Sequence, residues 1–533
     1  MDSKETRARF ITSGRVVKWL AAIVGLIFLF PIAYLTFGTV TLGSEFWATV
    51  TSRTTMLPLW NSVRLAVTTT IACVMIGTAL AFLVARTDLP GRRIWRVLLP
   101  LPLAVPSFVG ATALLAAFGP GSLLAFMPRM DGYWGAFLVL TFLSYPYVYL
   151  PVLARLASTS PALEEASQLL GGGRRRTFGQ VLLPQIRSSM LAGGLLVFLY
   201  VLSDFGAVAL LRYNAITRAI FSSRLFDRST ALTLGLLLAV LALVVAATQR
   251  FMTSGRSTST DVHVHQVRYR LDSLRPAAIA AVATPVVIGL LLPVVVFLFW
   301  VFRGTATTGA GYGGWGDDLA FLGAPLVNSA GAAVVAALAA VVVVLPVSYV
   351  GARARGWLPA GATAAVSSVF ALPGLVVALA LVFWSIQAPG ALAFIYQTFP
   401  LLILAYVLHF GAQSMQASQA AIANLPRALD EAARTLGASR MRRFLTVDLP
   451  LIRPGLVAGG GLVLLSTLKE LPATLLLAPI GFQTLATKIW GAAEDGFFAE
   501  VGITALVLIA LSAALTWMVV LRRQPDELAE SHG

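Results

Sequence analysis

The chain has 533 residues, of which 58% are hydrophobic and only 12% charged, and its formal net charge is +16. Soluble domains carry roughly 25% charged residues, so this composition excludes an ordinary soluble protein and indicates one that uses the lipid bilayer as its solvent. The positive charge does not indicate nucleic-acid binding, because the basic residues flank apolar runs, as membrane topology requires. The single cysteine, Cys73, excludes a disulfide framework.

Apolar runs long enough to cross a membrane follow one another along the whole chain. A spanning helix needs roughly 20 mostly apolar residues, and the runs are too uniformly apolar for the alternating strands of an outer-membrane barrel. The first run follows a basic segment without a cleavage site, so we expect an uncleaved span and not a signal peptide. We therefore predict an all-α polytopic membrane protein of about twelve transmembrane helices. The predicted spans are 17–39, 61–85, 94–118, 134–154, 189–211, 231–251, 276–301, 328–352, 362–386, 397–420, 454–478 and 500–521.

The distribution of basic residues predicts the orientation. If the N-terminus is cytoplasmic, the predicted cytoplasmic segments hold 29 of the 39 Lys and Arg residues. Cytoplasmic loops of membrane proteins are enriched in these residues. We therefore expect a multi-pass protein of the bacterial inner membrane with both termini in the cytoplasm.

The second half of the chain repeats the first at an offset of 266–267 residues. Six spans in each half give both halves the same orientation, which predicts a parallel repeat about an axis along the membrane normal. The predicted parts are a first repeat over 1–252, a polar cytoplasmic linker over 253–274 and a second repeat over 275–533. The matched residues include Asn61-Ser62 with Asn328-Ser329, Ala85-Arg86 with Ala352-Arg353, Pro106 with Pro373, Leu183-Pro184 with Leu449-Pro450, and Arg187 with Arg453.

The strongest match between the halves lies in the predicted cytoplasmic loop after the fourth span of each, over 155–187 and 421–453. In both loops a glutamate is followed by two small residues, and a glycine comes six residues after the glutamate. A leucine-proline pair closes each loop. The small residues allow another protein to approach closely. The first copy consists of Glu165, Ala166, Ser167 and Gly171, and the second of Glu431, Ala432, Ala433 and Gly437.

These loops resemble the EAA motif of bacterial ABC importer permeases, E-A-A-x3-G-x9-I-x-L-P. The first copy departs from it at Ser167, and both copies have Val where the motif has Ile. The resemblance implies that each loop forms a coupling helix that docks on a separate ATP-binding subunit. Glu165 and Glu431 would make the polar contacts, and Gly171 and Gly437 would allow the turn after the helix.

The resemblance also implies the partners and the mechanism. We expect two copies of the ATP-binding subunit and an extracytoplasmic solute-binding protein that delivers the substrate. ATP-driven closure of the ATPase pair would expose the pathway to alternate sides of the membrane. ATP and Mg²⁺ would bind the partner, and we expect no cofactor, metal or nucleic acid on this chain. A phosphate-binding loop needs a Gly-Lys pair, and none of the four lysines follows a glycine, so the chain is not expected to be an enzyme.

Two carboxylates lie within predicted spans. Charges at the bilayer centre cost at least ~2.5–3.5 kcal/mol, so such residues are functional candidates by default. Asp204 in the fifth span and Glu470 in the eleventh are repeat-equivalent, so two-fold symmetry would direct both toward the shared axis. Either they face a cationic substrate, or they are structural and satisfied by neighbours. His409, also within a span, is expected to be a packing residue.

Two segments are most similar to fused ferric-iron permeases: 202–221, which contains Asp204, and 468–490, which contains Glu470. Fe³⁺ is a hard cation that prefers oxygen ligands, which suits paired carboxylates. The resemblance thus implies ferric iron as the substrate. Thiamine and polyamine permeases are alternatives that share the architecture or the loop. A secondary transporter without an ATPase is the alternative from a different class, and the duplicated coupling loop argues against it.

Overall fold

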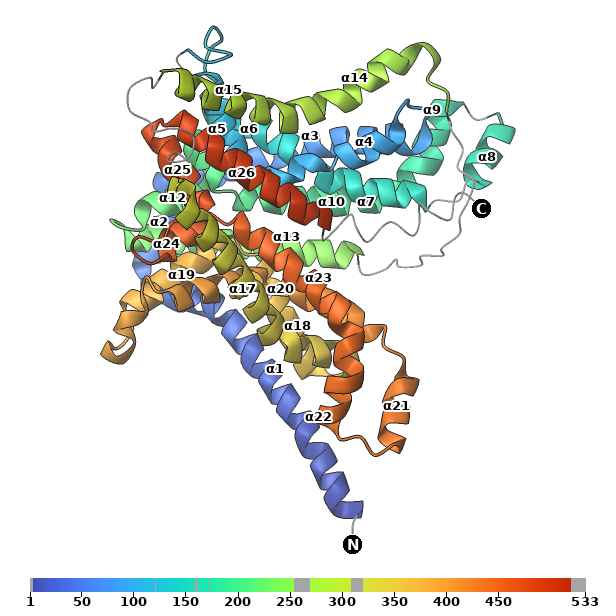
Figure 1. Cartoon of the computed structure of the whole chain (residues 1–533), viewed down its shortest axis with the longest axis vertical. Coiled ribbons are helices and arrows are strands. Elements are labelled where there is room, and N and C mark those ends of the chain that lie inside the picture. The colour runs from blue at the N-terminus through green and yellow to red at the C-terminus, as the bar shows by residue number, and fades with distance from the viewer. Residues whose placement is uncertain are drawn as a thin grey trace. The chain divides into compact units, whose positions relative to one another are not determined.

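The chain is almost entirely helical in a computed structural model, which describes residues 3–119, 121–158, 162–171, 173–253, 269–307 and 320–518. Figure 1 shows the helices by their labels. The α-helices of the first half are α1 (Ser3–Val40), α2 (Ser44–Thr51), α3 (Arg53–Arg86), α4 (Arg92–Leu98), α5 (Ser107–Ala117), α6 (Gly132–Ser144), α7 (Pro146–Ala157), α8 (Ala162–Leu169), α9 (Arg174–Thr177), α10 (Leu183–Ser203), α11 (Gly206–Leu210), α12 (Ile216–Ser223) and α13 (Arg228–Thr253). Those of the second half are α14 (Arg275–Val286), α15 (Leu292–Thr307), α17 (Ala320–Arg353), α18 (Trp357–Phe370), α19 (Gly374–Ile386), α20 (Phe399–Ala423), α21 (Arg427–Thr435), α22 (Arg440–Arg443), α23 (Leu449–Leu468), α24 (Pro472–Leu477), α25 (Leu485–Asp495) and α26 (Phe498–Thr516). Short 3-10 or π segments are η1 (Leu101–Ala104), η2 (Phe178–Leu182), η3 (Asp272–Leu274), η4 (Val287–Leu291), η5 (Gly390–Ile395) and η6 (Phe444–Asp448).

The described helices confirm an all-α membrane protein. Nine of them are long and apolar enough to cross a membrane, and two further pairs of helices would each make one more span. The remaining predicted span, 397–420, corresponds to α20, which is long enough but contains polar residues such as His409 and Gln413. About twelve spans therefore agrees with the described part of the chain.

Two of the predicted spans are sharply bent. The pair Arg92–Ala104 and Ser107–Ala117 bends by 88°, and the pair Trp357–Phe370 and Gly374–Ile386 bends by 101°. Pro106 and Pro373 directly precede α5 and α19. Proline removes an amide donor and keeps the residue before it out of the helical region. The repeated proline thus explains why both halves break at the same place.

The predicted fifth and eleventh spans are also interrupted. α10 ends at Ser203 and α23 ends at Leu468, and short helices, α11 and α24, follow after a break of two or three residues. The spans predicted from the sequence, 189–211 and 454–478, are continuous across these breaks, so the structure corrects them here. Asp204 and Glu470 both lie in the breaks, so the structure puts the two candidate carboxylates where the backbone leaves the helix.

The helices group into two compact units that each draw on both halves of the sequence. Unit 1 contains Met1–Phe46, Gly313–Lys488 and Leu511–Gly533, and unit 2 contains Trp47–Tyr312 and Ile489–Ala510. Within unit 1, α1 packs on α17, α18 and α19 (Figure 1). Its Gly25 crosses α18 so closely that an added Cβ would lie 3.1 Å from the Ala362 Cα atom.

Unit 2 shows the reciprocal arrangement. There α15, from the second half, packs on α5, and the Trp300 indole donates a hydrogen bond of 2.9 Å to the carbonyl of Ala116. The first long helix of each half is thus packed with helices of the other half. The predicted repeat boundaries divide the chain by sequence, and they stay a prediction. Residues 254–268 of the predicted linker lie outside the described residues.

Candidate functional site

The first EAA loop contains the short helix α8 in unit 2. Glu165 and Ala166 are exposed, whereas the hydroxyl of Ser167 lies 2.9 Å from that of Thr177. Ser167 therefore contacts the chain itself. Leu163 and Leu170 are 59% and 86% exposed. Leu169, at 88%, adds to them, and several exposed apolar side chains on one short helix suit contact with another protein.

The second EAA loop contains α21 in unit 1 and repeats this pattern. Glu431 and Ala432 are exposed, and Ala433 is buried. Leu436 is 86% exposed, like its counterpart Leu170, and Leu429 is 42% exposed. The predicted glutamates and their neighbours thus lie on the outer face of each helix, and the third motif residue lies on the inner face.

Gly171 and Gly437 end the two helices with left-handed backbone. Their φ angles are +77° and +74°, a region that costs an L-residue with a side chain roughly 1–2 kcal/mol. The preceding leucines complete the last helical turn, since the Leu170 and Leu436 amides donate to the carbonyls of Ala166 and Ala432. The backbone conformation at the end of each helix therefore explains why both positions are glycine.

A buried ion pair connects α8 to the end of α3. Arg86 Nη2 lies 2.9 Å from Glu164 Oε1, and neither side chain is exposed. The same Arg86 nitrogen donates to the carbonyl of Leu156 at 3.1 Å. Burial raises the pKa of the Glu164 carboxyl, and the Arg86 charge opposes that shift. Glu164, one residue before the predicted Glu165, thus fixes the helix to the membrane-spanning part of unit 2.

The end of the linker packs against this ion pair. The Tyr269 hydroxyl donates to Glu164 Oε2 at 3.3 Å, and the Tyr269 amide donates to the carbonyl of Arg86 at 2.8 Å. The Tyr269 ring stacks on Phe82, with centroids 5.9 Å apart. The segment that joins the two halves is therefore in contact with the first EAA loop.

A second contact holds this segment in place. Arg275 and Asp88 form an ion pair of 2.6 Å, and the Leu271 amide donates to Asp88 Oδ1 at 2.8 Å. The hydrogen bond from Arg275 lowers the pKa of Asp88. A lowered pKa means that the contact is present at neutral pH and lost only when the pH falls below the usual range of aspartate.

Unit 1 has related contacts with different residues. Arg353, the repeat equivalent of Arg86, donates to the carbonyl of Leu425 at 3.4 Å. Tyr349 donates to Asp448 Oδ2 at 3.1 Å, and Arg443 lies 3.9 Å from the same oxygen. The two EAA loops are thus attached to their units by different side chains.

Asp204 caps the helix that follows the break in unit 2. Its Oδ1 accepts hydrogen bonds from the amides of Ala207 and Val208, at 3.0 and 3.3 Å, at the start of α11. The side chain of Ser107, the first residue of α5, lies beside the carboxyl group. Asp204 is 7% exposed. The carboxylate therefore has a structural function at a helix start, in keeping with the preference of aspartate for such positions.

Glu470 does the same in unit 1. Its Oε1 accepts a hydrogen bond of 3.1 Å from the amide of Ala473 at the start of α24. A Cβ added to Gly374, the first residue of α19, would lie 2.7 Å from this oxygen and 3.2 Å from His409 Nε2. Glu470 and His409 therefore both lie against the α19 backbone at Gly374, a neighbourhood that the sequence alone did not indicate.

The sites of Asp204 and Glu470 have the same arrangement but differ in side-chain size. Ser107 and Gly374 are repeat-equivalent first residues of α5 and α19, and they contact Asp204 and Glu470 respectively. The longer glutamate occupies the space that a side chain at Gly374 would need. The first half combines the shorter acid with serine, and the second combines the longer acid with glycine.

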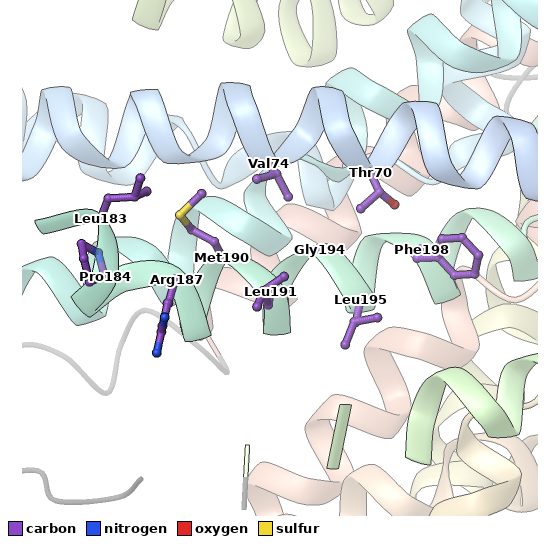
Figure 2. Close-up of a pocket in the computed structure, with 10 residues that line it drawn as sticks. All are labelled: Thr70, Val74, Leu183, Pro184, Arg187, Met190, Leu191, Gly194, Leu195 and Phe198. Atoms are coloured by element: carbon purple, nitrogen blue, oxygen red, sulfur yellow. The ribbon is translucent and has the colours of Figure 1, made fainter. Parts of the chain in front are cut away.

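A groove of about 540 Å³ lies between α3 and α10 in unit 2 (Figure 2). Its walls are almost entirely apolar, with Thr70 and Val74 on α3 and Leu191 and Phe198 on α10. Arg187 extends away from α3 at one end of the groove (Figure 2). An apolar wall offers no hydrogen bonds to a hydrated ion, so this groove is not a cation site.

The chain was compared with known proteins. Residues 74–257 and 345–524 both match the family described as "Binding-protein-dependent transport system inner membrane component". The chain is 31% identical to the Fe(3+)-transport system permease protein FbpB 2 of Haemophilus influenzae, over 85% of this chain and 87% of that protein. It is 24% identical to the probable ABC transporter permease protein y4fN of Sinorhizobium fredii, over 88% and 87% of the two chains. The molybdenum permease ModB of Mycobacterium tuberculosis is 31% identical over 38% of this chain and 81% of its own.

The chain therefore belongs to the family of inner-membrane components of binding-protein-dependent transport systems, and it carries the family's domain twice. It is a multi-pass membrane permease subunit of an ABC importer and a transport protein. The family acts together with an ATP-binding subunit and a solute-binding protein. This confirms the class that the duplicated EAA loops indicated.

Sequence reasoning missed three features of the site. It chose Glu165 and overlooked the buried Glu164, it assigned no role to the repeated Ala85-Arg86 and Asn61-Ser62 pairs, and it did not foresee that both carboxylates cap helices. The repeats themselves were a signal, because a charged residue that recurs at the end of a span has a reason to be there.

Proposed function

We propose that this chain is the permease of a ferric-iron importer. The observation that supports this most is its 31% identity, over 85% of the chain, to a protein described as an Fe(3+)-transport permease. The same observation does not favour the alternative substrates, which are thiamine, whose permeases share the architecture, and polyamines, whose permeases share the EAA loop. The family membership does not favour a transporter that works without an ATPase.

The two EAA helices would each dock on one copy of an ATP-binding subunit. The exposed Glu165 and Glu431 and the exposed Leu170 and Leu436 support this proposal, because they give both helices the same charged and apolar outer face. ATP and Mg²⁺ would bind that partner. Motion of the partner would reach unit 2 through the Arg86–Glu164 ion pair.

Both termini would be cytoplasmic. Figure 1 shows the N-terminal end of α1 at the same end of unit 1 as α21 and α22. Since the ATP-binding subunit is the cytoplasmic partner, a loop that docks on it puts that end of unit 1 inside the cell. The excess of Lys and Arg in the same segments agrees with this orientation.

Asp204 and Glu470 would contact the ferric ion on its way through the membrane. Their hydrogen bonds to the α11 and α24 amides use one oxygen of each carboxylate, Oδ1 and Oε1. The second oxygen would serve as the ligand, and hard cations prefer such oxygen ligands. The breaks in the helices at these residues support a pathway position, since irregular backbone at membrane depth is tolerated where it is buried or lines a cavity.

The test is uptake of radiolabelled Fe³⁺ by cells that lack the chain, with the ATP-binding subunit and the binding protein present. The unaltered chain is expected to restore uptake, and a chain with Glu165→Arg and Glu431→Arg is expected not to. Labelled thiamine and spermidine are assayed in parallel. Restored uptake of either in place of iron would overturn the ferric assignment and leave the permease class intact.

A further inference from the structure

The repeated Asn-Ser pairs lie at the end of α3 and α17 that is far from the coupling loops. Asn61 precedes Arg86 by 25 residues on the continuous helix α3, which is a distance of about 37 Å at 1.5 Å per residue. Asn328 precedes Arg353 by the same 25 residues on α17. The two pairs are therefore at the end of each helix opposite the residues that hold the coupling loops.

In unit 2 the pair holds the loop between α11 and α12, residues 211–215. Asn61 Nδ2 donates to the carbonyl of Asn214 at 2.9 Å, and the amide of Ile216 donates to Ser62 Oγ at 2.7 Å. Ser62 is 4% exposed. The Tyr213 hydroxyl adds a bond of 2.9 Å to the carbonyl of Asn61.

In unit 1 the equivalent pair makes the same two bonds to the loop between α24 and α25, residues 478–484. Asn328 Nδ2 donates to the carbonyl of Gln483 at 3.0 Å, and the amide of Leu485 donates to Ser329 Oγ at 2.7 Å. Ser329 is 3% exposed. Identical bonds from repeat-equivalent residues, at distances that agree within 0.1 Å, indicate a shared design.

The two loops held by the Asn-Ser pairs, 211–215 and 478–484, carry exposed residues and have buried neighbours. On their outer side they present exposed residues, among them Arg212 and Asn214 in one loop and Ile480, 91% exposed, in the other. In unit 2 the end of the loop also lies next to the segment that contains Asp204. Thr217, one residue after the Ser62 contact, donates to the carbonyl of Asp204 at 2.6 Å.

Each tether therefore joins a loop to a helix whose far end holds a coupling loop. In unit 2 the connection is complete, because α3 carries the Ser62 contact at one end and the Arg86–Glu164 ion pair to α8 at the other. A helix is a stiff element, so a displacement of the loop is transmitted along it only when the loop is fixed to it.

We propose that Asn61, Ser62, Asn328 and Ser329 are positioning residues that fix loops 211–215 and 478–484 to α3 and α17, so that docking of the binding protein on these loops is transmitted to the coupling helices. The proposal rests on the function proposed above: the coupling loops are cytoplasmic, so loops 211–215 and 478–484, near the opposite ends of α3 and α17, face the extracytoplasmic side. The proposal gives the repeated Asn-Ser pairs a role of their own. Neither substrate contact nor ATPase docking requires these pairs.

The test uses the full importer in lipid nanodiscs, with its ATP-binding subunits and binding protein. The variant chain carries Ser62→Ala and Ser329→Ala, and the conservative variant carries Ser62→Thr and Ser329→Thr, which keep the hydroxyl acceptor. Ser348→Ala is the matched control, because Ser348 is buried in α17 and its hydroxyl donates to neither loop but to the carbonyls of Val344 in its own helix, at 2.9 Å, and of Met415 in α20, at 3.5 Å.

Two quantities are measured. Hydrogen exchange at the Ile216 and Leu485 amides should become about fivefold faster in the alanine variant, because a neutral hydrogen bond contributes roughly 1 kcal/mol. Stimulation of ATP hydrolysis by the binding protein should fall toward the basal rate, while the basal rate stays unchanged. The threonine variant and Ser348→Ala should behave like the unaltered chain.

Faster exchange with full stimulation in the alanine variant would overturn the proposal, because the tethers would then be structural only. If the double alanine variant does not assemble, Ser62→Ala and Ser329→Ala are measured singly, and full stimulation in both would overturn it as well. The unaltered chain tests the proposed function separately, since its stimulation depends on which binding protein and substrate are supplied.

Discussion

Arg86 and Glu164 form an ion pair of 2.9 Å in which neither side chain is exposed. The pair joins the last residue of α3 to the short helix of the first EAA loop. Removing one partner of a buried pair leaves an uncompensated charge and costs about 3–5 kcal/mol, whereas replacing both by apolar residues is often neutral.

Glu164→Ala is therefore expected to release α8 from unit 2. Limited proteolysis at 162–171 should become faster, and less ATP-binding subunit should co-purify. Arg86→Met together with Glu164→Leu should restore both. Glu165→Ala is the control, because Glu165 is exposed and should leave the proteolysis rate unchanged. Equal proteolysis of the Glu164→Ala and Glu165→Ala chains would contradict this reading of the ion pair.

Charge reversal on the outer face of both EAA helices should abolish docking. A chain with Glu165→Arg and Glu431→Arg is expected to fold, because both side chains are exposed, but not to retain the ATP-binding subunit on co-purification. Glu494→Arg with Asp495→Arg makes the same change of charge on exposed residues outside the loops and should retain it. Normal assembly of the first variant would show that these glutamates are not docking residues.

The glycines that end the EAA helices should not tolerate a side chain. Gly171→Ala and Gly437→Ala meet no atom within 4 Å, so their cost is backbone strain alone, about 1–2 kcal/mol each. We expect reduced ATPase assembly, with asparagine milder than alanine at both positions. Gly173→Ala is the control, since a Cβ there also meets no atom and its backbone is not left-handed. An equal loss of ATPase assembly in Gly173→Ala would show that the left-handed backbone of Gly171 and Gly437 is not the cause.

The Asp204–Ser107 and Glu470–Gly374 sites should be interchangeable. Gly374→Ser alone puts a Cβ atom 2.7 Å from Glu470 Oε1 and is expected to lower thermal stability. Glu470→Asp shortens the acid and should restore stability in the double variant, which reproduces the pairing of the first half. A double-mutant cycle measures this coupling, and additive losses would contradict it.

The helix-capping function and the substrate contact of the carboxylates can be separated. Asp204→Asn with Glu470→Gln keeps an oxygen acceptor for the α11 and α24 amides, so assembly and stability should stay close to normal. Iron uptake should fall, because the charge is lost. Asp227→Asn is the control, since Asp227 also accepts an amide hydrogen bond at a helix start, from Thr230 at 3.0 Å. Unchanged uptake in the double variant would assign Asp204 and Glu470 to structure only.

Much of the architecture could be predicted from the sequence because the bilayer imposes strong rules on it. Apolar length predicted the spans. The duplicated Glu-to-Gly spacing marked the two loops, and their resemblance to the EAA motif predicted the protein class. The helix breaks at Pro106 and Pro373 could have been predicted from the repeated proline. Hydropathy alone does not predict them, because an apolar run has the same hydropathy whether the helix is straight or bent.

The contacts around the site were harder to predict. Glu164 and Glu165 are neighbours in the chain but lie about 100° apart on a helix, so one is buried and the other exposed. A motif matched by residue type does not show which face meets the rest of the protein. The caps made by Asp204 and Glu470 likewise depend on where α11 and α24 begin, which follows from the packing of several helices.

The first long helix of each half packs on helices of the other half, and this has a consequence for how the protein is assembled during synthesis. α1 is synthesised before the helices on which it packs, since these begin only at Ala320. Until they are synthesised, α1 has lipid in place of its final neighbours, and unit 1 cannot be completed. If the halves were separate polypeptides, each would have to find a partner that was making the same exchange. Synthesis as one chain supplies that partner once, in equal amount and at high effective concentration, so the fusion itself favours correct assembly.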